Sequence, residues 1–342
     1  LSAIYAKVRE LNEKKDKTYS ALLKELSLNN VFHKQLKNLS KAETEFLESY
    51  YAYEIKPFLN AVIVDKRHPF PFLNNKEIYA VGKLNSKSGV KLGIISCGKK
   101  FERVIFLPTE NEDEISFVLA EELILHFADK AFDGYKFEEK ALMRITRNAD
   151  INIEESFDDE LDFRQNMSVL INKRKRLCPV RLQLSKNLSD LTCAELCTRL
   201  ELTKKQVFIE KAPLDFSFVF SIFQKAENKK HLFFEPQQPQ MSPAVMENIS
   251  MISQIDKGDI FLSYPYESMK PFIRLLEEEA ADPTVVSIKM TLYRVAKNSK
   301  IIKALCAAAE NGKDVLVLVE LRARFDEENN IGWSKLLEES GC

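Results

Sequence analysis

Residues 285–329 contain a strand–helix–strand pattern, and this pattern constrains the fold more than any other stretch of the chain. Val285–Tyr293 is a short apolar and β-branched run, which predicts a strand. Ser299 is a helix N-cap residue, and apolar residues then recur at helical spacing until Gly312, a common stop signal. Asp314–Leu321 is apolar almost throughout, which predicts a second strand covered on both faces. We therefore expect two parallel strands joined by a right-handed crossover helix.

Three arginines directly follow these two strands. Arg294 follows the first strand, and Arg322 and Arg324 follow the second. Because parallel strands end at one edge of a sheet, the guanidiniums should converge there, where ligands bind in open α/β sheets. Guanidinium groups suit phosphate oxygens, and the crossover helix begins at the same edge with N–H groups that attract anions. The pattern predicts a phosphate site built from Arg294 and Arg324, with Arg322 as a further candidate.

A structural explanation of the same arginines stays open at this point. Arginines after strands are often solvated or paired with nearby acids. Asp326, Glu327 and Glu328 follow within a few residues and could supply such partners. On this interpretation the arginines would form surface ion pairs and bind no ligand.

The same region resembles the long-chain polyphosphate kinase family, which makes polyphosphate from ATP. The matching segments are DIFLSYPYES (Asp259–Ser268), DPTVVSIKMTLYRVAKNSKII (Asp282–Ile302) and NGKDVLVLVELRARFDEENNIGW (Asn311–Trp333). The resemblance is strong from about Asp259 onward and looser from Leu1 to Phe234. It implies that the chain is a middle piece of a longer kinase.

The resemblance assigns roles to two of the arginines. In this family the arginine of the LYR segment and that of the ARFDEE segment belong to the nucleotide and magnesium site, which implies Arg294 and Arg324 here. Arginine has no lone pair to give a metal, so we interpret the role as holding phosphates that carry Mg²⁺. The resemblance also implies ATP, ADP and inorganic polyphosphate as partners, and assembly as a dimer or tetramer.

The histidines depart from the family pattern. Family members act through a phosphohistidine in an I-H-A-K-type segment downstream of the matched region. The four histidines of this chain lie in no such segment: His33, His68, His126 and His231. We therefore expect no catalytic nucleophile in this chain, a nucleophilic histidine after Cys342, and no complete phosphoryl transfer by the chain alone.

The pattern of helical, mixed and proline-rich stretches along the sequence predicts a multidomain α and α/β protein. Residues 1–56 contain amphipathic helices and a capping box at Ser40–Glu43, as expected for the end of an N-terminal helical domain. Residues 57–234 mix strands and helices and predict an α+β head domain. Residues 235–248 open with EPQQPQMSP, whose prolines predict a linker. Residues 249–342 resemble the first part of the family's C-terminal phospholipase D-like catalytic domain.

Individual elements are also predicted outside the arginine-bearing region. Strands are expected at Glu77–Leu84, Val90–Cys97, Val104–Leu107, Ala141–Ile153, Val180–Leu184, Val207–Glu210 and Ile260–Tyr264. Helices are expected at Leu1–Leu26, Glu112–Phe132, Asp158–Leu177, Ser268–Ala281 and Asn329–Ser340, with a further helix capped at Thr192–Glu195. Asn85–Gly89 has the chemistry of a hairpin turn.

Two other basic features have a functional and a structural interpretation. Arg147 lies in TRNAD, similar to the family's T-R-D-A-E-like segment, and could bind substrate, but a structural salt bridge is the favoured interpretation. The run Lys173–Arg176 could guide polyphosphate. Cations at a helix C-terminus also complement the helix dipole, and we favour this second explanation.

Composition and missing motifs exclude several classes of protein. With 50 basic and 51 acidic residues the net charge is −1, which disfavours a broad nucleic-acid surface. No apolar run reaches the ~18 residues of a membrane span. The six cysteines form no zinc pattern, so we expect reduced thiols in a cytoplasmic protein, with a peripheral position at the inner membrane left open. No P-loop, dinucleotide fingerprint or hydrolase elbow is present.

Three functions remain after these exclusions. The first is a polyphosphate kinase that transfers the γ-phosphoryl group of ATP to a polyphosphate end. The second is a phospholipase D-like hydrolase or nuclease, and the third is a non-catalytic phosphate-binding and assembly module. The LYR and ARFDEEN segments favour the kinase.

Overall fold

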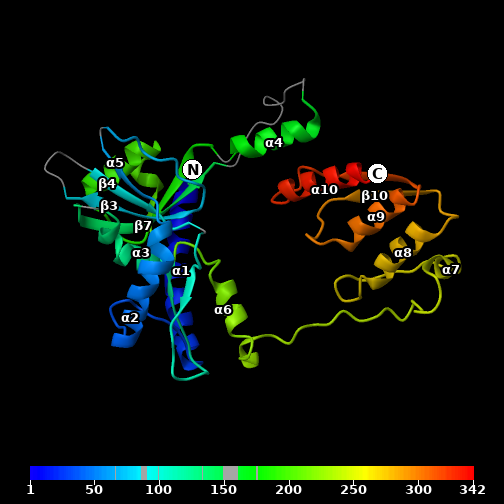
Figure 1. Ribbon diagram of the computed structural model, residues 1–342, viewed down its shortest axis with the longest axis horizontal. Coiled ribbons are helices and arrows are strands. Elements are labelled where there is room, and N and C mark those ends of the chain that lie inside the picture. The colour runs from blue at the N-terminus through cyan, green and yellow to red at the C-terminus, as the bar shows by residue number, and fades with distance from the viewer. Residues whose placement is uncertain (66, 86–90, 99, 133, 149–160, 175) are drawn as a thin grey trace. The chain divides into compact units, whose positions relative to one another are not determined.

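The structure is a computed structural model, and it describes residues 1–65, 67–85, 91–98, 100–132, 134–148, 161–174 and 176–342. The chain divides into two compact units (Figure 1). Unit 1 comprises Leu1–Asp150 and Arg174–Leu232, and unit 2 comprises Ile151–Lys173 and Phe233–Cys342. Among the described residues, every helix is too short or too polar to span a membrane.

Two sheets form the frame of unit 1. The larger has the strand order β2-β4-β3-β7-β8-β9, antiparallel except for the parallel pair β8–β9. Its strands are β2 (Ala61–Val64), β3 (Ile78–Leu84), β4 (Lys91–Ser96), β7 (Phe137–Arg147), β8 (Pro179–Leu184) and β9 (Val207–Ile209). The smaller sheet, β1-β6-β5, comprises β1 (Val31–His33), β5 (Val104–Phe106) and β6 (Ile115–Leu119).

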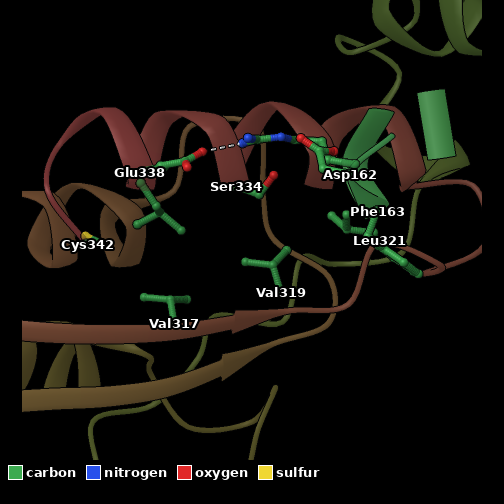
Figure 2. A pocket seen from close by; sticks show the side chains of 10 residues that line it. Asp162, Phe163, Val317, Val319, Leu321, Ser334, Glu338 and Cys342 are labelled. Atoms are coloured by element: carbon green, nitrogen blue, oxygen red, sulfur yellow. Dashed lines mark ion pairs between the residues drawn. The ribbon is translucent and has the colours of Figure 1, made fainter. Parts of the chain in front are cut away.

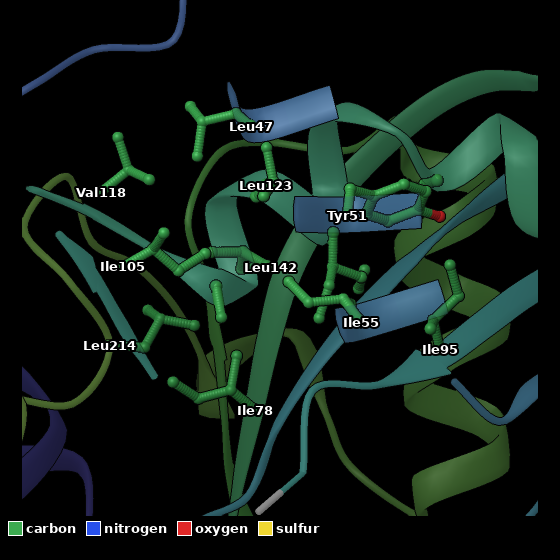
Figure 3. Packing of buried hydrophobic residues seen from close by; sticks show 14 of the residues in the cluster. Leu47, Tyr51, Ile55, Ile78, Ile95, Ile105, Val118, Leu123, Leu142 and Leu214 are labelled. Atoms are coloured by element: carbon green, nitrogen blue, oxygen red, sulfur yellow. The ribbon is translucent and has the colours of Figure 1, made fainter. Parts of the chain in front are cut away.

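Helices cover these sheets and close the main core of unit 1. They are α1 (Ser2–Leu28), α2 (Lys41–Tyr50), α3 (Ala120–His126), α5 (Asp190–Leu200) and α6 (Val219–Lys225). The predicted capping box of α2 is confirmed, because Ser40 accepts from the N–H of Glu43 and Glu43 from that of Ser40. A buried apolar cluster joins this region to α3 and the larger sheet (Figure 3). Leu47 of α2 belongs to it, as do Tyr51 and Ile55 of the π-helical turn that follows α2. Each such buried side chain contributes roughly 1.5–3 kcal/mol.

The predicted helix Glu112–Phe132 is wrong in its first part. Ile115–Leu119 is instead the strand β6, buried at every position and paired with both β1 and β5, and the helix begins only at Ala120. A segment that is apolar on all sides has no periodic face, so its spacing cannot separate strand from helix.

Other predictions for unit 1 shift only at their boundaries. The cap of α5 is Ser189, whose side chain accepts from the N–H of Thr192, so this helix starts before the predicted cap at Thr192. Asn85–Gly89 lies almost wholly outside the described residues. Ile153, the predicted end of a strand, and Asp158, the predicted start of a helix, belong to unit 2 and also lie outside the described residues.

In its described residues, unit 2 contains a parallel strand pair that packs against helices. Its elements are α4 (Phe163–Arg174), α7 (Met251–Ile255), α8 (Lys270–Ala281), β10 (Ser287–Leu292), α9 (Lys300–Glu310), β11 (Asp314–Val319) and α10 (Glu327–Glu339). Leu305 and Ala308 of α9 are completely buried in its core with Val315 of β11. The predicted crossover is confirmed at both ends, since Ser299 caps α9 and Gly312 follows it with φ +81°.

Two predictions for unit 2 are wrong. The strand β11 is not covered on both faces, because Leu316 and Leu318 are 62% and 66% exposed. Ile260–Tyr264 is not a strand in the described structure, and its Phe261 is 83% exposed. Within the described part of the chain, the sheet of unit 2 contains two strands. The described residues therefore supply no third strand to pair with Ile260–Tyr264 and no layer that covers the outer face of β11.

Candidate functional site

The strands β10 and β11 are parallel, as predicted, and their ends define one edge of the unit 2 sheet. Their register ends with Leu292 opposite Val319. Directly beyond the strands, the N–H of Glu320 donates to the carbonyl oxygen of Leu292 at 2.9 Å. The loops that carry Arg294 and Arg324 therefore begin side by side at the carboxyl edge of the sheet.

The guanidinium of Arg294 extends from the first loop to the second. Its Nη2 donates to the backbone oxygen of Arg324 at 2.9 Å, and its Nε lies 3.1 Å from Oδ2 of Asp326. The side chains of Arg294 and Asp326 are 53% and 34% exposed, so both can be reached from solvent. A guanidinium has five N–H donors, so Arg294 can bind a phosphate while keeping both contacts. The structure thus brings the two arginine-bearing loops together, and it also contains an ion pair of the kind that the alternative explanation expects.

The other two arginines are exposed and contact aromatic rings. The Cζ atom of Arg324 lies 5.5 Å from the ring centroid of Phe325, a residue that has φ +75° and is 82% exposed. A bulky residue in this left-handed region is strained, so the turn must be held by its surroundings. The Cζ atom of Arg322 lies 5.6 Å from the ring centroid of Phe163, at the start of α4. Arg294 and Arg324 are therefore the centre of the candidate site, and Arg322 borders it toward α4.

Two asparagines at the start of α10 hold the loops in place, and our sequence analysis missed them. Nδ2 of Asn330 donates to the backbone oxygens of Tyr293, at 2.7 Å, and Glu320, at 2.9 Å. Nδ2 of Asn329 donates to the backbone oxygen of Val295 at 3.0 Å. The available signal was the Asn–Asn pair directly after the acidic DEE run, but nothing in the spacing indicates which carbonyls it reaches.

The start of α9 lies at the same edge, as predicted. The hydroxyl of Ser299 accepts a 3.4 Å hydrogen bond from the N–H of Ile302, so one of the orphan donors of this helix is already satisfied. Lys297 and Lys300 are exposed on either side of the cap. These residues add positive charge near the arginine-bearing loops.

A hollow of about 510 Å³ lies between α4, α10 and β11 (Figure 2). Val317, Val319 and Leu321 form its apolar floor. Arg164 and Glu338 also line the hollow, and their side chains form an ion pair at 2.7 Å. The arginines of the candidate site do not line this hollow, and the carboxylates of Asp162 and Glu338 in its lining do not suit a phosphate.

Arg147 and His33 belong to unit 1. Arg147 is 8% exposed and donates to the backbone oxygens of Leu73 and Leu177, so among the described residues it binds carbonyl groups and not the carboxylate of the favoured salt bridge. His33 is also structural, with its ring stacked on Phe117 at 4.8 Å and hydrogen bonds on both ring nitrogens. The basic run Lys173–Arg176 lies partly outside the described residues.

A direct metal centre is not found in the described structure. Among the described residues, no group of three or more His, Cys, Asp or Glu side chains is arranged to hold an ion. The arginines of the candidate site cannot ligate a metal themselves. The site suits an anion, or a cation that arrives already bound to phosphates.

Two family profiles match the chain, and the second of them contains this site. The profile of the polyphosphate kinase middle domain matches residues 42–222, and that of polyphosphate kinase C-terminal domain 1 matches residues 250–342. The chain belongs to the polyphosphate kinase family. The second profile includes β10, β11, Arg294 and Arg324, and the two matches confirm the resemblance that the LYR and ARFDEEN segments indicated.

Polyphosphate kinases of several bacteria are similar over the whole chain. The protein of Bacillus anthracis is 37% identical over 351 residues, which is 100% of this chain and 50% of that protein. The protein of Campylobacter jejuni is 36% identical over 348 residues, which is 100% of this chain and 49% of that protein. The crystal structure of polyphosphate kinase from Porphyromonas gingivalis matches with a TM-score of 0.76 at 22% sequence identity, over 99% of this chain and 49% of that one. The chain thus spans about half the length of these relatives, and its mixed α and β fold is similar to that of the Porphyromonas gingivalis structure.

Proposed function

We propose that the carboxyl edge of β10 and β11 binds the phosphates of Mg²⁺–ATP in an enzyme that transfers the γ-phosphoryl group to polyphosphate. The observation that carries this proposal is the hydrogen bond from Arg294 to the main chain of Arg324, which brings the two arginine-bearing loops together at a ligand-binding edge. The family assignment supports the choice of nucleotide and polyphosphate among the anions that such a site could bind.

The arginines would act by electrostatics and positioning. Phosphoryl transfer spreads negative charge over the oxygens of the transferred group, and fixed guanidiniums stabilise that charge. Mg²⁺ would arrive with the nucleotide as part of the substrate and would neutralise part of the charge on its phosphates. Arg294 and Arg324 would hold those oxygens, and the exposed Lys297 and Lys300 would raise the local concentration of the anionic substrate.

We also propose that the phosphoryl group passes through a histidine supplied from outside these 342 residues. All four histidines of the chain belong to unit 1, whereas the arginines belong to unit 2. Two examples show structural hydrogen bonds: the ring of His68 is hydrogen-bonded to Asp65 at 2.9 Å, and the ring of His231 to Asn29 at 2.9 Å. The chain alone should therefore acquire no acid-labile, base-stable phosphate from ATP, and stoichiometric labelling of this kind would refute this part of the proposal.

A phospholipase D-like domain is the architecture that we propose for the C-terminal part. A parallel strand pair joined by a crossover helix supports this choice, and the family assignment agrees with it. In such a domain the phosphate site is built at strand ends, as Arg294 and Arg324 are here.

Arginine substitutions test the proposed site. In the intact enzyme, Arg294→Ala or Arg324→Ala should weaken Mg²⁺–ATP binding by about 10- to 100-fold, since a hydrogen bond to a charged group contributes about 1.5–3 kcal/mol. Arg199→Ala is the matched control, because Arg199 also pairs with a carboxylate on the surface, that of Glu195 at 2.8 Å. Calorimetric titration measures the affinity, and ATP-dependent polyphosphate formation measures turnover. If both arginine variants bind and turn over like Arg199→Ala, the proposed site is wrong.

A further inference from the structure

Asn330 connects the two arginine-bearing loops through the main chain. The residue is completely buried at the start of α10. One Nδ2 hydrogen bond goes to Tyr293, the residue before Arg294, and the other goes to Glu320, the first residue after β11. A single amide group thus joins the ends of both strands at the edge where the arginines emerge.

The neighbouring residue extends this connection. Asn329 donates to the backbone oxygen of Val295, the residue after Arg294. The carbonyl groups on both sides of Arg294 are therefore bound by consecutive amides of α10. Arg294 has few ways to shift relative to the second loop without breaking one of these bonds.

We propose that Asn330 is a positioning residue that sets the spacing between the two arginine-bearing loops and so aligns their guanidiniums on the substrate phosphates. This inference rests on the proposed function of the site. Asn330 does not touch the substrate in this proposal, because it is buried behind the loops. It acts through the main chain at Tyr293 and Glu320.

The chemistry of the amide supports a role for its donors. Both N–H groups of Asn330 are used, whereas its Oδ1 is buried and has no hydrogen-bond partner among the described residues. Buried polar atoms usually have hydrogen-bond partners, so an unpaired buried oxygen is unfavourable. If this position served only to fill space in the core, an apolar side chain would do so without leaving such an oxygen. Leucine fills a similar volume without donors. Aspartate keeps the shape but directs carboxylate oxygens at two carbonyl oxygens.

A double-mutant cycle distinguishes positioning from a general structural role. In the intact enzyme, Asn330→Leu should lower kcat/KM for ATP by about 100-fold, the loss expected from a misplacement of about 1 Å at a catalytic site. With Arg294 already changed to alanine, the same substitution should cost less than about threefold more, because residues that act together are not additive. If the loss of kcat/KM in the double variant equals the product of the losses in the two single variants, the proposal is wrong.

Asn311→Ala is the control for this cycle. Nδ2 of Asn311 also donates to a backbone oxygen, that of Ala280 at 2.9 Å, but at the opposite end of the same strands. Its activity should stay within about twofold of wild type in both backgrounds, since distant sites are independent. An equal loss in Asn311→Ala would show that any weakened bond in unit 2 has the same effect, and would also overturn the proposal.

A folding control and a second variant separate a loss of alignment from a loss of folding. Fluorescence of Trp333, the one tryptophan of the chain, reports whether Asn330→Leu folds. If Asn330→Leu does not fold, Asn329→Ala is measured in its place. Asn329 is half-buried, and this substitution removes only its hydrogen bond to the backbone oxygen of Val295. The loss of a single hydrogen bond should lower kcat/KM by about 3- to 10-fold. Unchanged activity in Asn329→Ala would then reject positioning by these amides. If Arg294→Ala itself is fully active, the proposed function fails whatever Asn330 does.

Discussion

The carboxylate of Glu210 should be one of the most sensitive single positions in unit 1. Its side chain is 0% exposed and lies between α1 and the larger sheet. It accepts from Arg181 at 2.6 Å, from Gln183 at 2.8 Å and from Asn12 of α1 at 3.1 Å, and it also pairs with Lys15. We predict that Glu210→Gln, which keeps the size and removes the charge, strongly destabilises this unit.

The magnitude follows from the burial of the partners. Removing one charge of a buried ion pair costs about 3–5 kcal/mol, because the other charge is left uncompensated. The cations Lys15 and Arg181 are 30% and 28% exposed, so water screens them in part. We therefore expect about 3 kcal/mol, at the low end of that range. For a unit of about 200 residues this lowers Tm by about 6–12 °C.

Urea and thermal unfolding followed by far-UV circular dichroism measure this change in the free energy of unfolding. Glu10→Gln is the control, because Glu10 is an exposed acid of α1 whose pair with Lys7 should contribute less than about 1 kcal/mol. Trp333 belongs to unit 2, so its fluorescence midpoint should not move. A loss below about 1 kcal/mol for Glu210→Gln would refute the argument, since it would mean that the cations are solvated rather than dependent on Glu210.

Three further predictions concern stability. Leu305→Ala empties a completely buried site on α9 and should cost about 2–5 kcal/mol, seen as a lower urea midpoint of Trp333 fluorescence; a loss under about 1 kcal/mol would contradict a packed core. Ser299→Ala removes the N-cap of α9 and should cost about 1 kcal/mol in the same assay, whereas Ser299→Asp should stay near wild type. Burial alone would raise the pKa of Asp215, but hydrogen bonds and the guanidinium of Arg103 hold that pKa below its ordinary value of 3.8. The carboxylate therefore contributes stability above about pH 4 that is lost as the pH falls further, and Asp215→Asn should flatten this acid-side decline in urea unfolding; an unchanged slope would contradict it.

The arginine-bearing part of unit 2 could be predicted closely from the sequence. The limits of β10, α9 and β11 lie within about two residues of the predicted ones, because the N-cap Ser299, the helical spacing and Gly312 act on their own neighbours in the chain. The position of Arg294 and Arg324 after the same ends of two parallel strands also follows from the sequence, since a short crossover helix requires parallel strands. Their part in binding a nucleotide stays a prediction until the arginine variants are measured.

The contacts that support the site could not be predicted in the same way. Asn330 looks like any polar residue early in a helix, and only the fold brings it to the carbonyl groups of Tyr293 and Glu320. The charged middle of α1 is a similar case. Lys15 and Asp16 suggest a solvated face, yet Lys15 pairs with Glu210, and Asp16 accepts from the N–H groups of Lys211 and Ala212.

The sequence by itself therefore determined where β10, α9 and β11 begin, which way the two strands run, and which arginines follow them at their shared edge. The tertiary structure alone decided that Ile115–Leu119 is a strand, that Leu316 and Leu318 face solvent, and that α10 fastens the loops of the site. The physical reason is the range of the interactions. Backbone preference, capping and periodicity act over a few residues, whereas the partner of a buried hydrogen bond or the cover of a sheet face comes from residues far away along the chain.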